Sequence, residues 1–411
     1  MTGAGRSPDR SPRKPAGAVW IVTVLAAGFI SAMTAPGQTV GLSVFTDPLI
    51  DELGIDRSQL SLSYLIATLI GASAQPLIGR AADRWDIRKV MCATALALAL
   101  SLLLLSVVSE FFGLTFGYIG VRMAGQGALS LAVTTAVSRM IVHRRGLALG
   151  VMSAIGTAGI SLSPIALEPL IASVGAQAAW RWEALVVVVV VFTAAALLPR
   201  PVTPGERRGS EPVGRGYTVA EARRTGMFWV LAAAVSTSAM LGTALGFHQI
   251  SLLGERGLSS FEAAANFLPQ TATGLISTLL VGALIDRYDP RIFVVFSMAT
   301  IAGAMAVYPF IAGSWSAVLY GLILGASGGS LRGMEAAAFV KYYGVAHIGA
   351  IRGLSMMMVL GASALGPYAL SIGRDLAAGF TAPVLILGAL PLLVIVAVAL
   401  VRPPPGRAVT G

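Results

Sequence analysis

The sequence predicts an all-α membrane protein in which twelve transmembrane helices form two six-helix bundles. Three observations support this fold class. Hydrophobic residues make up 56% of the 411 residues, and the mean hydropathy is +0.80. The apolar residues gather in twelve long runs, many of them separated by short charged segments. A pattern of glycines and charged residues in the first half of the chain returns 203 positions later in the second half.

The twelve apolar runs have the length of helices that cross a membrane. About 20 apolar residues in a helix cross the ~30 Å hydrocarbon core, and the helix satisfies its own backbone polar groups there. The expected helices cover residues 18–40, 59–79, 90–109, 113–137, 146–172, 182–199, 226–250, 260–285, 291–311, 316–340, 350–371 and 380–401. Because no small-residue cleavage site precedes a polar region, we expect the first run to be an uncleaved span.

The cations predict how the protein lies in the membrane. Of the 29 Lys and Arg residues, 23 fall in segments on one side, and four fall on the other: Arg57, Arg181, Arg256 and Arg374. Loops rich in Lys and Arg stay in the cytoplasm. We therefore expect a multi-pass protein of the cell (plasma) membrane with both termini in the cytoplasm. The net charge of +10 then reflects topology, and no nucleic-acid partner is expected. The single cysteine, Cys92, leaves no intrachain disulfide.

An internal repeat relates the two halves. One constant offset aligns glycines, charged residues and a proline, namely Gly71 with Gly274, Asp83 with Asp286, Arg84 with Arg287, Arg88 with Arg291, Gly125 with Gly328, and Pro164 with Pro367. Such regularity indicates duplication. Because each half has six helices, an even number, an axis along the membrane normal relates them. The expected divisions are a cytoplasmic tail (1–17), the first bundle (18–199), a cytoplasmic linker (200–225), the second bundle (226–401) and a cytoplasmic tail (402–411).

The motif after the second expected helix, Gly79-x-x-x-Asp83-Arg84-x-x-x-Arg88, resembles that of the major facilitator superfamily, with Asp86 in place of the family's usual glycine. The stretches "RMAGQGALSL", "HRRGLALGVMSAIGTAG", "AAWRWEAL", "YTVAEARRTGMFWVL" and "HIGAIRGL" are similar to its monocarboxylate and oxalate–formate antiporter-like branch. The resemblance covers about residues 18–401. It implies a secondary active transporter, an antiporter or symporter, that works by alternating access.

The two charged loops contain acids that membrane topology does not explain. Asp83 and Asp286 lie among cations, whereas acids contribute little to orientation. In the resembled family this loop locks the cytoplasmic side shut between the two halves. The resemblance therefore implies the gating residues Asp83, Arg84, Arg88, Asp286, Arg287 and Arg291. The alternative is that these charges brace each loop locally.

Polar side chains inside the expected spans are candidates for function, because they are costly in a membrane. They are Arg122, Gln126, Arg332, Glu335, His248, Gln249 and Gln38. In the resembled family the first, fourth, seventh and tenth helices line the central cavity, and fixed arginines suit an anionic substrate. Arg332 could instead pair with Glu335, Arg122 could be structural, and His248 could be solvated at the interface. Glu335 is a candidate for proton coupling.

The predicted function is secondary active transport of a small organic anion, such as a monocarboxylate or dicarboxylate, with a coupling proton or counter-substrate. Proton-coupled efflux of drug-like molecules is an alternative, although Leu162-Ser163-Pro164-Ile165 replaces the Gly-Pro-x-x-x-Gly-Gly pattern of drug–proton antiporters. A non-transporting receptor is another, but the longest polar segment has only about 26 residues. No repeated pore motif suggests a channel. No catalytic, phosphate-binding or metal-ligand pattern predicts an enzyme, a cofactor or a metal, and we expect a monomer.

Overall fold

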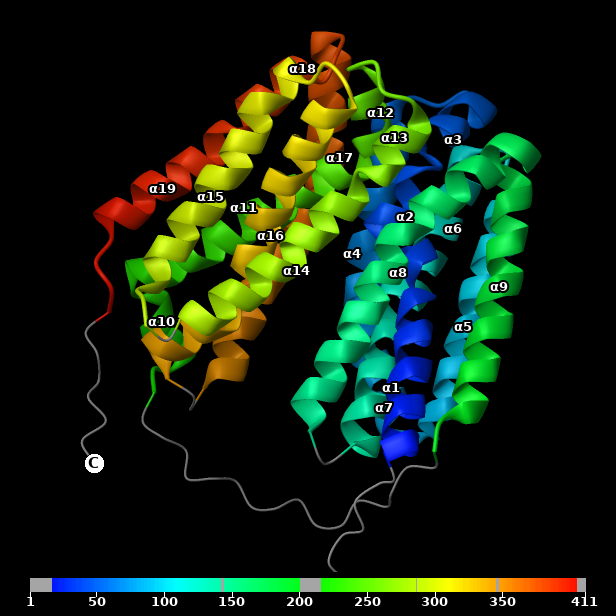
Figure 1. Ribbon diagram of the computed structural model, residues 1–411, viewed down its shortest axis with the longest axis horizontal. Helices are drawn as coiled ribbons and strands as arrows, with labels where there is room; N and C mark the ends of the chain where they lie inside the picture. Colours follow the sequence, from blue (N-terminus) through cyan, green and yellow to red (C-terminus); the bar gives the residue numbers. More distant parts are fainter. Residues whose placement is uncertain (1–16, 142–143, 200–215, 286, 345–346, 405–411) are drawn as a thin grey trace, which may run out of the picture.

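The two halves of the chain form two groups of helices that lie side by side (Figure 1). This computed structural model describes residues 17–141, 144–199, 216–285, 287–344 and 347–404; the side chains at 18, 74–84, 145–146 and 336 are not described. Within the described residues all regular secondary structure is helical. The predicted all-α fold class is thereby confirmed.

The N-terminal half contains the elements that lead from the first helix to the linker. They are α1 (Gly17–Ala32), η1 (Ala35–Gly37), α2 (Thr39–Ser43), α3 (Thr46–Leu53), α4 (Arg57–Arg84), α5 (Ile87–Leu105), α6 (Phe111–Val121), the π-helical η2 (Arg122–Leu129), α7 (Ser130–Met140), α8 (Arg145–Val174) and α9 (Ala176–Leu197). The segment α6–η2–α7 is continuous and replaces the single regular helix expected at 113–137.

The C-terminal half repeats this organisation. It contains α10 (Val219–Arg223), α11 (Gly226–Phe247), α12 (Gln249–Gly254), α13 (Ser260–Ala265), α14 (Phe267–Leu284), α15 (Pro290–Val307), η3 (Tyr308–Phe310), α16 (Ser314–Tyr343), α17 (Ile348–Ala377), α18 (Thr381–Leu387) and α19 (Ala389–Leu400). Each of the twelve expected runs thus lies on one helix or on helices that follow each other directly. In the described part of the chain, nine of these are long and apolar enough to span a membrane.

Helix boundaries follow from local capping. The Asp86 side chain accepts a hydrogen bond from the backbone N–H of Arg88 at 2.9 Å and begins α5. Asp289, at the repeat-related position, does the same for Arg291 at 2.9 Å and begins α15. A carboxylate at a helix N-terminus accepts a hydrogen bond from a free backbone N–H and interacts favourably with the positive end of the helix dipole. One acid of each charged loop is therefore explained by local structure.

Glycines allow α14 and α16 to approach closely. Four of them recur every fourth position on α16: Gly321, Gly325, Gly329 and Gly333. A Cβ atom on Gly325 would lie 2.1 Å from the backbone oxygen of Gln270, and one on Gly329 would lie 2.2 Å from that of Gly274. Small residues on one helix face let backbones pack closely in a membrane. This stripe fixes α16, and the side chains it carries, against α14.

The two halves meet at the end of the molecule that holds α3 and α12, here called the α3 end (top of Figure 1). Ser251 of α12 donates to both carboxylate oxygens of Asp47, at 2.7 and 2.8 Å, and accepts from Arg57 at 2.8 Å. Arg57 also pairs with Asp47 at 2.5 Å. The ribbons of the two halves diverge toward the opposite end, which holds α10 and is called the α10 end (Figure 1).

Candidate functional site

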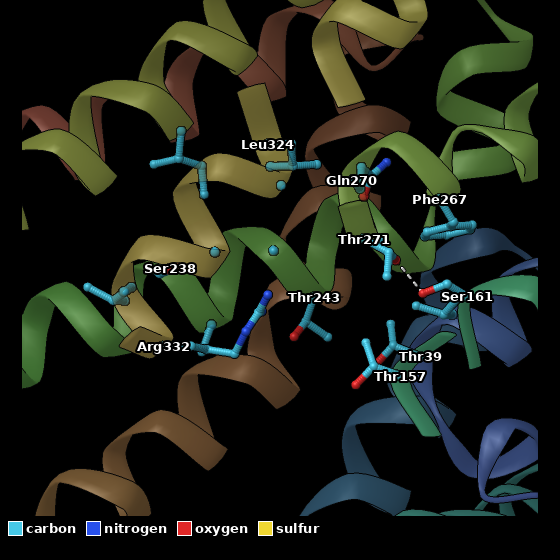
Figure 2. Close-up of a pocket in the computed structure, with 18 of the residues that line it drawn as sticks. Thr39, Thr157, Ser161, Ser238, Thr243, Phe267, Gln270, Thr271, Leu324 and Arg332 are labelled. Atoms are coloured by element: carbon cyan, nitrogen blue, oxygen red, sulfur yellow. Dashed lines mark hydrogen bonds between the residues drawn. The ribbon is translucent and has the colours of Figure 1, made fainter. Parts of the chain in front are cut away.

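A cavity of about 530 Å³ lies between the two halves, within the range usual for small-molecule sites (Figure 2). Both halves contribute polar side chains to its wall. These are Thr39 of α2, Thr157 and Ser161 of α8, Ser238 and Thr243 of α11, Gln270 and Thr271 of α14, and Arg332 and Glu335 of α16. The rest of the wall is mainly apolar or glycine. Among the described residues no cluster of His, Cys, Asp or Glu could hold a metal ion.

Arg332 supplies a positive charge to this cavity. Its side chain is exposed, and Figure 2 shows it reaching from α16 into the space between the halves. Two glycines leave room for the guanidinium group: a Cβ atom on Gly274 would lie 2.9 Å from Nη2, and one on Gly328 would lie 3.3 Å from Nη1. Within the described residues, the guanidinium has neither an ion-pair nor a hydrogen-bond partner. It is therefore available to a ligand.

Glu335 also lines the cavity but is paired elsewhere. Its Oε1 atom lies 3.5 Å from Nη2 of Arg352 on α17. The two side chains are 22% and 42% exposed, so water screens this contact. The local pair between Arg332 and Glu335, an alternative reading of the sequence, is not formed in this structure. Glu335, one turn from Arg332, therefore does not form an ion pair with it.

A chain of amides fixes the orientation of Gln270 at the other side of the cavity. Gln249 donates from Nε2 to the Ala263 carbonyl at 2.9 Å, and Asn266 donates from Nδ2 to the Ala317 carbonyl at 2.6 Å. The side-chain oxygens of Gln249 and Asn266 therefore face Gln270, whose Nε2 donates to them at 2.7 and 3.0 Å. The amide oxygen of Gln270 points toward Thr271 and the cavity (Figure 2).

A hydroxyl pair crosses between the halves beside Gln270. Oγ of Ser161 on α8 lies 2.5 Å from Oγ1 of Thr271 on α14 (Figure 2). Either hydroxyl can donate, and each keeps further capacity to accept. The cavity thus has a cationic side at Arg332 and a neutral polar side at Gln270, Thr271 and Ser161.

Arg122 lies away from this cavity, inside the N-terminal half. It is 2% exposed. Its Nε donates to Thr68 at 3.1 Å and its Nη1 to the Gly37 carbonyl at 3.0 Å, while the guanidinium lies 4.6 Å from the centre of the Tyr64 ring. In this conformation, two N–H groups of Arg122 therefore have hydrogen-bond acceptors, and its charge lies against an aromatic ring. Substrate binding by Arg122 stays a prediction.

The four remaining candidates from the sequence lie outside the cavity wall. Gln249 is buried and holds Gln270 in place, but does not line the cavity itself. Gln38 donates to Thr34 within its own segment at 3.2 Å. His248 is fully buried where the halves meet, with Nε2 3.0 Å from the Pro367 carbonyl and 3.4 Å from the Ser61 hydroxyl. Gln126, half-buried on η2, is also outside the cavity wall. Direct substrate contact by these four residues stays a prediction.

The predicted gating residues are described only in part. Asp286 lies outside the described residues, and so do the side chains of Asp83 and Arg84. Arg88 donates to the Leu198 carbonyl, a contact within its own half. Arg287 is exposed, and the backbone N–H of Arg291 is capped by Asp289. The gate at these positions therefore stays a prediction.

Sequence reasoning missed the neutral polar wall. Gln270, Thr271 and Ser161 are uncharged, and short polar residues are common in membrane helices. A usable signal was nevertheless present, because Asn266 and Gln270 stand four positions apart and so share one helix face with Gly274. Amides on the same face as a tightly packed glycine indicate a buried polar network.

Three relatives with assigned names place the chain among transporters. It is 26% identical over 220 residues to the oxalate:formate antiporter of Oxalobacter formigenes, an alignment that covers 52% of this chain and 50% of the antiporter. It is 28% identical over 159 residues to the MFS-type transporter hasB of Aspergillus fumigatus, covering 37% and 34%. It is 25% identical to the uncharacterized MFS-type transporter YcxA of Bacillus subtilis over 88% of this chain and 90% of YcxA. The chain thus spans half or less of the first two relatives.

Solved structures share the fold. A bacterial homolog of the human lysosomal transporter Spinster, inward-facing and unoccupied, superposes with a TM-score of 0.73 at 15% identity, covering 94% of this chain and 96% of the homolog. Its inward-facing, occupied form gives a TM-score of 0.71 at 16% identity, covering 96% of each chain. The sequence profile of the Major Facilitator Superfamily matches residues 19–367. As the sequence resemblance predicted, the chain belongs to the Major Facilitator Superfamily, a family of membrane transporters and not of enzymes.

Proposed function

We propose that the protein moves a small organic anion across the membrane by alternating access, and that Arg332 binds the anion. The main support is that the Arg332 guanidinium lies in the cavity between the halves and has no ion-pair or hydrogen-bond partner among the described residues. A charge placed inside a membrane protein is costly unless a partner or water offsets it. Because Glu335 already pairs with Arg352, a carboxylate ligand is the natural partner for Arg332.

The distribution of charge favours an anion over a cation. Among the described residues, Arg332 and Glu335 are the ionisable side chains in the cavity wall, and Arg352 offsets part of the charge of Glu335. The net field at the Arg332 side is therefore positive. A guanidinium can bind a carboxylate through two parallel N–H···O bonds, which adds geometric specificity. The name of the antiporter relative, which pairs oxalate with formate, supports the same substrate class.

The shape of the molecule supports alternating access with the α3 end closed. Hydrogen bonds from Ser251 to Asp47 and from Arg57 to Ser251 join the halves there, and the rings of Tyr64 and Phe247 pack across the same interface, 4.5 Å apart. The excess of Lys and Arg in the segments at the other end supports a cytoplasmic position for the α10 end. The structure then corresponds to a state open toward the cytoplasm, in which Arg332 can exchange its ligand.

Anion binding to the purified protein tests the proposal. Thermal-shift screening against mono- and dicarboxylates should reveal stabilising anions, because a ligand that binds only the folded state raises its stability. Counterflow in liposomes then tests transport of the same compounds. Arg332→Gln should remove the stabilisation and the counterflow, whereas Arg402→Gln, a control at an exposed arginine, should change neither.

Two results would contradict the assignment. If Arg332→Gln binds the anions with wild-type affinity, the substrate charge is read elsewhere. If cationic or neutral compounds stabilise the wild-type protein and no carboxylate does, organic-anion transport is excluded. Arg332→Lys should retain weak binding, because it keeps the charge and loses the bidentate geometry.

A further inference from the structure

On the side of the cavity opposite Arg332, the Gln270 amide presents an acceptor and not a donor. The Gln270 amide could in principle turn either end toward a ligand. Its orientation is decided by two backbone carbonyls, those of Ala263 and Ala317, which can only accept hydrogen bonds. They fix the amides of Gln249 and Asn266, and these in turn occupy both N–H groups of Gln270. The amide oxygen of Gln270 is the group left for the cavity.

This acceptor has no partner among the described residues. The neighbouring hydroxyls of Ser161 and Thr271 bond to each other. Gln249 is 1% exposed and Asn266 is 3% exposed, so rotation of the Gln270 amide would leave buried polar groups unpaired. An unsatisfied buried donor or acceptor costs more than a typical hydrogen bond gains. The amide is therefore held in one orientation, and its free oxygen selects for a ligand that donates a hydrogen bond.

We propose that the transported anion is a hydroxy acid, with its carboxylate on Arg332 and its hydroxyl group donating to Gln270. This inference rests on the proposed function. Gln270 and Gly274 are one turn apart on α14, about 6 Å along the axis, and Gly274 lies against the Arg332 guanidinium. A chain of about four carbon atoms can therefore place its carboxylate and its hydroxyl group at the two sites.

Two related ligand classes fit the cavity less well. A fully ionised dicarboxylate would bring a second set of oxygens against the amide oxygen of Gln270, which repels them, and the Ser161–Thr271 pair has only one hydroxyl proton left to donate to them. An amino acid would supply a donor, but its ammonium group lacks an unpaired carboxylate in the described cavity wall, because Glu335 is paired with Arg352. A hydroxyl group donates without carrying a charge that the site leaves uncompensated.

Binding of four-carbon acids of matched length tests the inference. The probes are butyrate, 4-hydroxybutyrate, 3-hydroxybutyrate, 4-aminobutyrate and succinate, measured by calorimetry at neutral pH with the full-length protein in detergent. Whichever of the two hydroxybutyrates binds more tightly should bind about tenfold more tightly than butyrate. The difference corresponds to the hydrogen bond to Gln270, which butyrate cannot donate. Succinate and 4-aminobutyrate should bind more weakly than this hydroxy acid.

Variants assign the preference to the amide. Gln270→Met keeps the side-chain length and removes the acceptor, so the hydroxybutyrate and butyrate affinities should become equal while butyrate binding persists. If Gln270→Met does not fold, Gln249→Met tests the same point, because it releases one of the two bonds that orient Gln270 and should reduce the preference. Arg332→Gln should weaken every probe, with or without a hydroxyl group.

The outcomes separate this inference from the proposed function. If no carboxylate binds the wild-type protein, the proposed function fails. If butyrate and both hydroxybutyrates bind equally well and depend on Arg332, the function stands and the hydroxy-acid inference is overturned. Tighter binding of 4-aminobutyrate or succinate would also overturn it, in favour of an amino acid or a dicarboxylate. If both Gln270→Met and Gln249→Met still prefer a hydroxybutyrate over butyrate, the Gln270 amide is not the group that recognises the hydroxyl.

Discussion

The Ser251 hydroxyl lies 2.7 and 2.8 Å from the two carboxylate oxygens of Asp47 and shares its one proton with that carboxylate, which joins the C-terminal half to the N-terminal half. Arg57 completes the contact by binding both residues. The Arg57 side chain is only 11% exposed, which reduces screening of its charge by water. Charged side chains thus take part in the junction between the halves at the α3 end.

Asp47→Asn should open the α3 end more often. The change removes the negative charge that Arg57 faces, and the closed state loses about 1 kcal/mol, or about fivefold in population. The measurement uses Thr243→Cys in the cavity, in a Cys92→Ser background, with a membrane-impermeant thiol reagent added to intact cells. Labelling should be faster with Asp47→Asn than without it.

A matched control lies one turn further along α3. Asp51 is exposed and has no described contact with the C-terminal half, so Asp51→Asn changes the net charge equally without touching the junction. Labelling should be as slow as in the parent. Equal labelling in Asp47→Asn, Asp51→Asn and the parent would show that this contact does not hold the α3 end closed.

Gly329→Ala should destabilise the C-terminal half. The added methyl group would lie 2.2 Å from the Gly274 backbone oxygen and 2.8 Å from its Cα atom, so α14 and α16 would have to separate. Overpacking of this kind costs about 1–3 kcal/mol. Gly303→Ala is the control, because Gly303 on α15 has no atom within 4 Å of the added group. Thermal unfolding should show a lower midpoint for the first variant alone; equal midpoints would contradict the close packing.

The fold was largely predictable from the sequence because its determinants are periodic and local. Twelve apolar runs and the repeat between Gly71 and Gly274 gave the helices and the two-half organisation. The π-helical segment η2 was not predictable. It begins at Arg122, whose contacts with Gly37 and Thr68 come from other parts of the chain. Apolar periodicity carries no information about such contacts.

The candidate site was predictable only where charge made it conspicuous. Arg332 and Glu335 were found because ionisable residues are rare in membrane helices. The sequence could not show that Glu335 pairs with Arg352, since the partner lies on another helix. Nor could it show that Gln249 acts through Gln270, because the orientation of an amide depends on neighbours distant in sequence.

Arg122→Leu should lower the stability of the N-terminal half. The substitution leaves the Gly37 carbonyl and the Thr68 hydroxyl without their donor in a buried site, which costs about 1–3 kcal/mol. Arg332→Leu should leave the unfolding midpoint of the ligand-free protein unchanged, because Arg332 has no described partner. Both variants are compared by thermal unfolding and by anion binding. Loss of binding by Arg122→Leu at wild-type stability would instead show that Arg122 is a substrate ligand, as the sequence predicted.

Glu335→Gln should separate anion binding from proton coupling. Glu335 lies in the cavity wall one turn from Arg332, and the part of its negative charge that Arg352 does not offset reduces the positive field that attracts the substrate. Glu335→Gln removes this negative charge and leaves Arg352 without its carboxylate partner, so anion binding should become tighter. If a proton on Glu335 accompanies the substrate, the wild-type protein should show uptake into liposomes that an imposed proton gradient accelerates. Glu335→Gln should retain counterflow and lose this acceleration, whereas Glu110→Gln, at an exposed acid, should retain both. Acceleration that persists in Glu335→Gln would mean that the coupling proton is carried by another group.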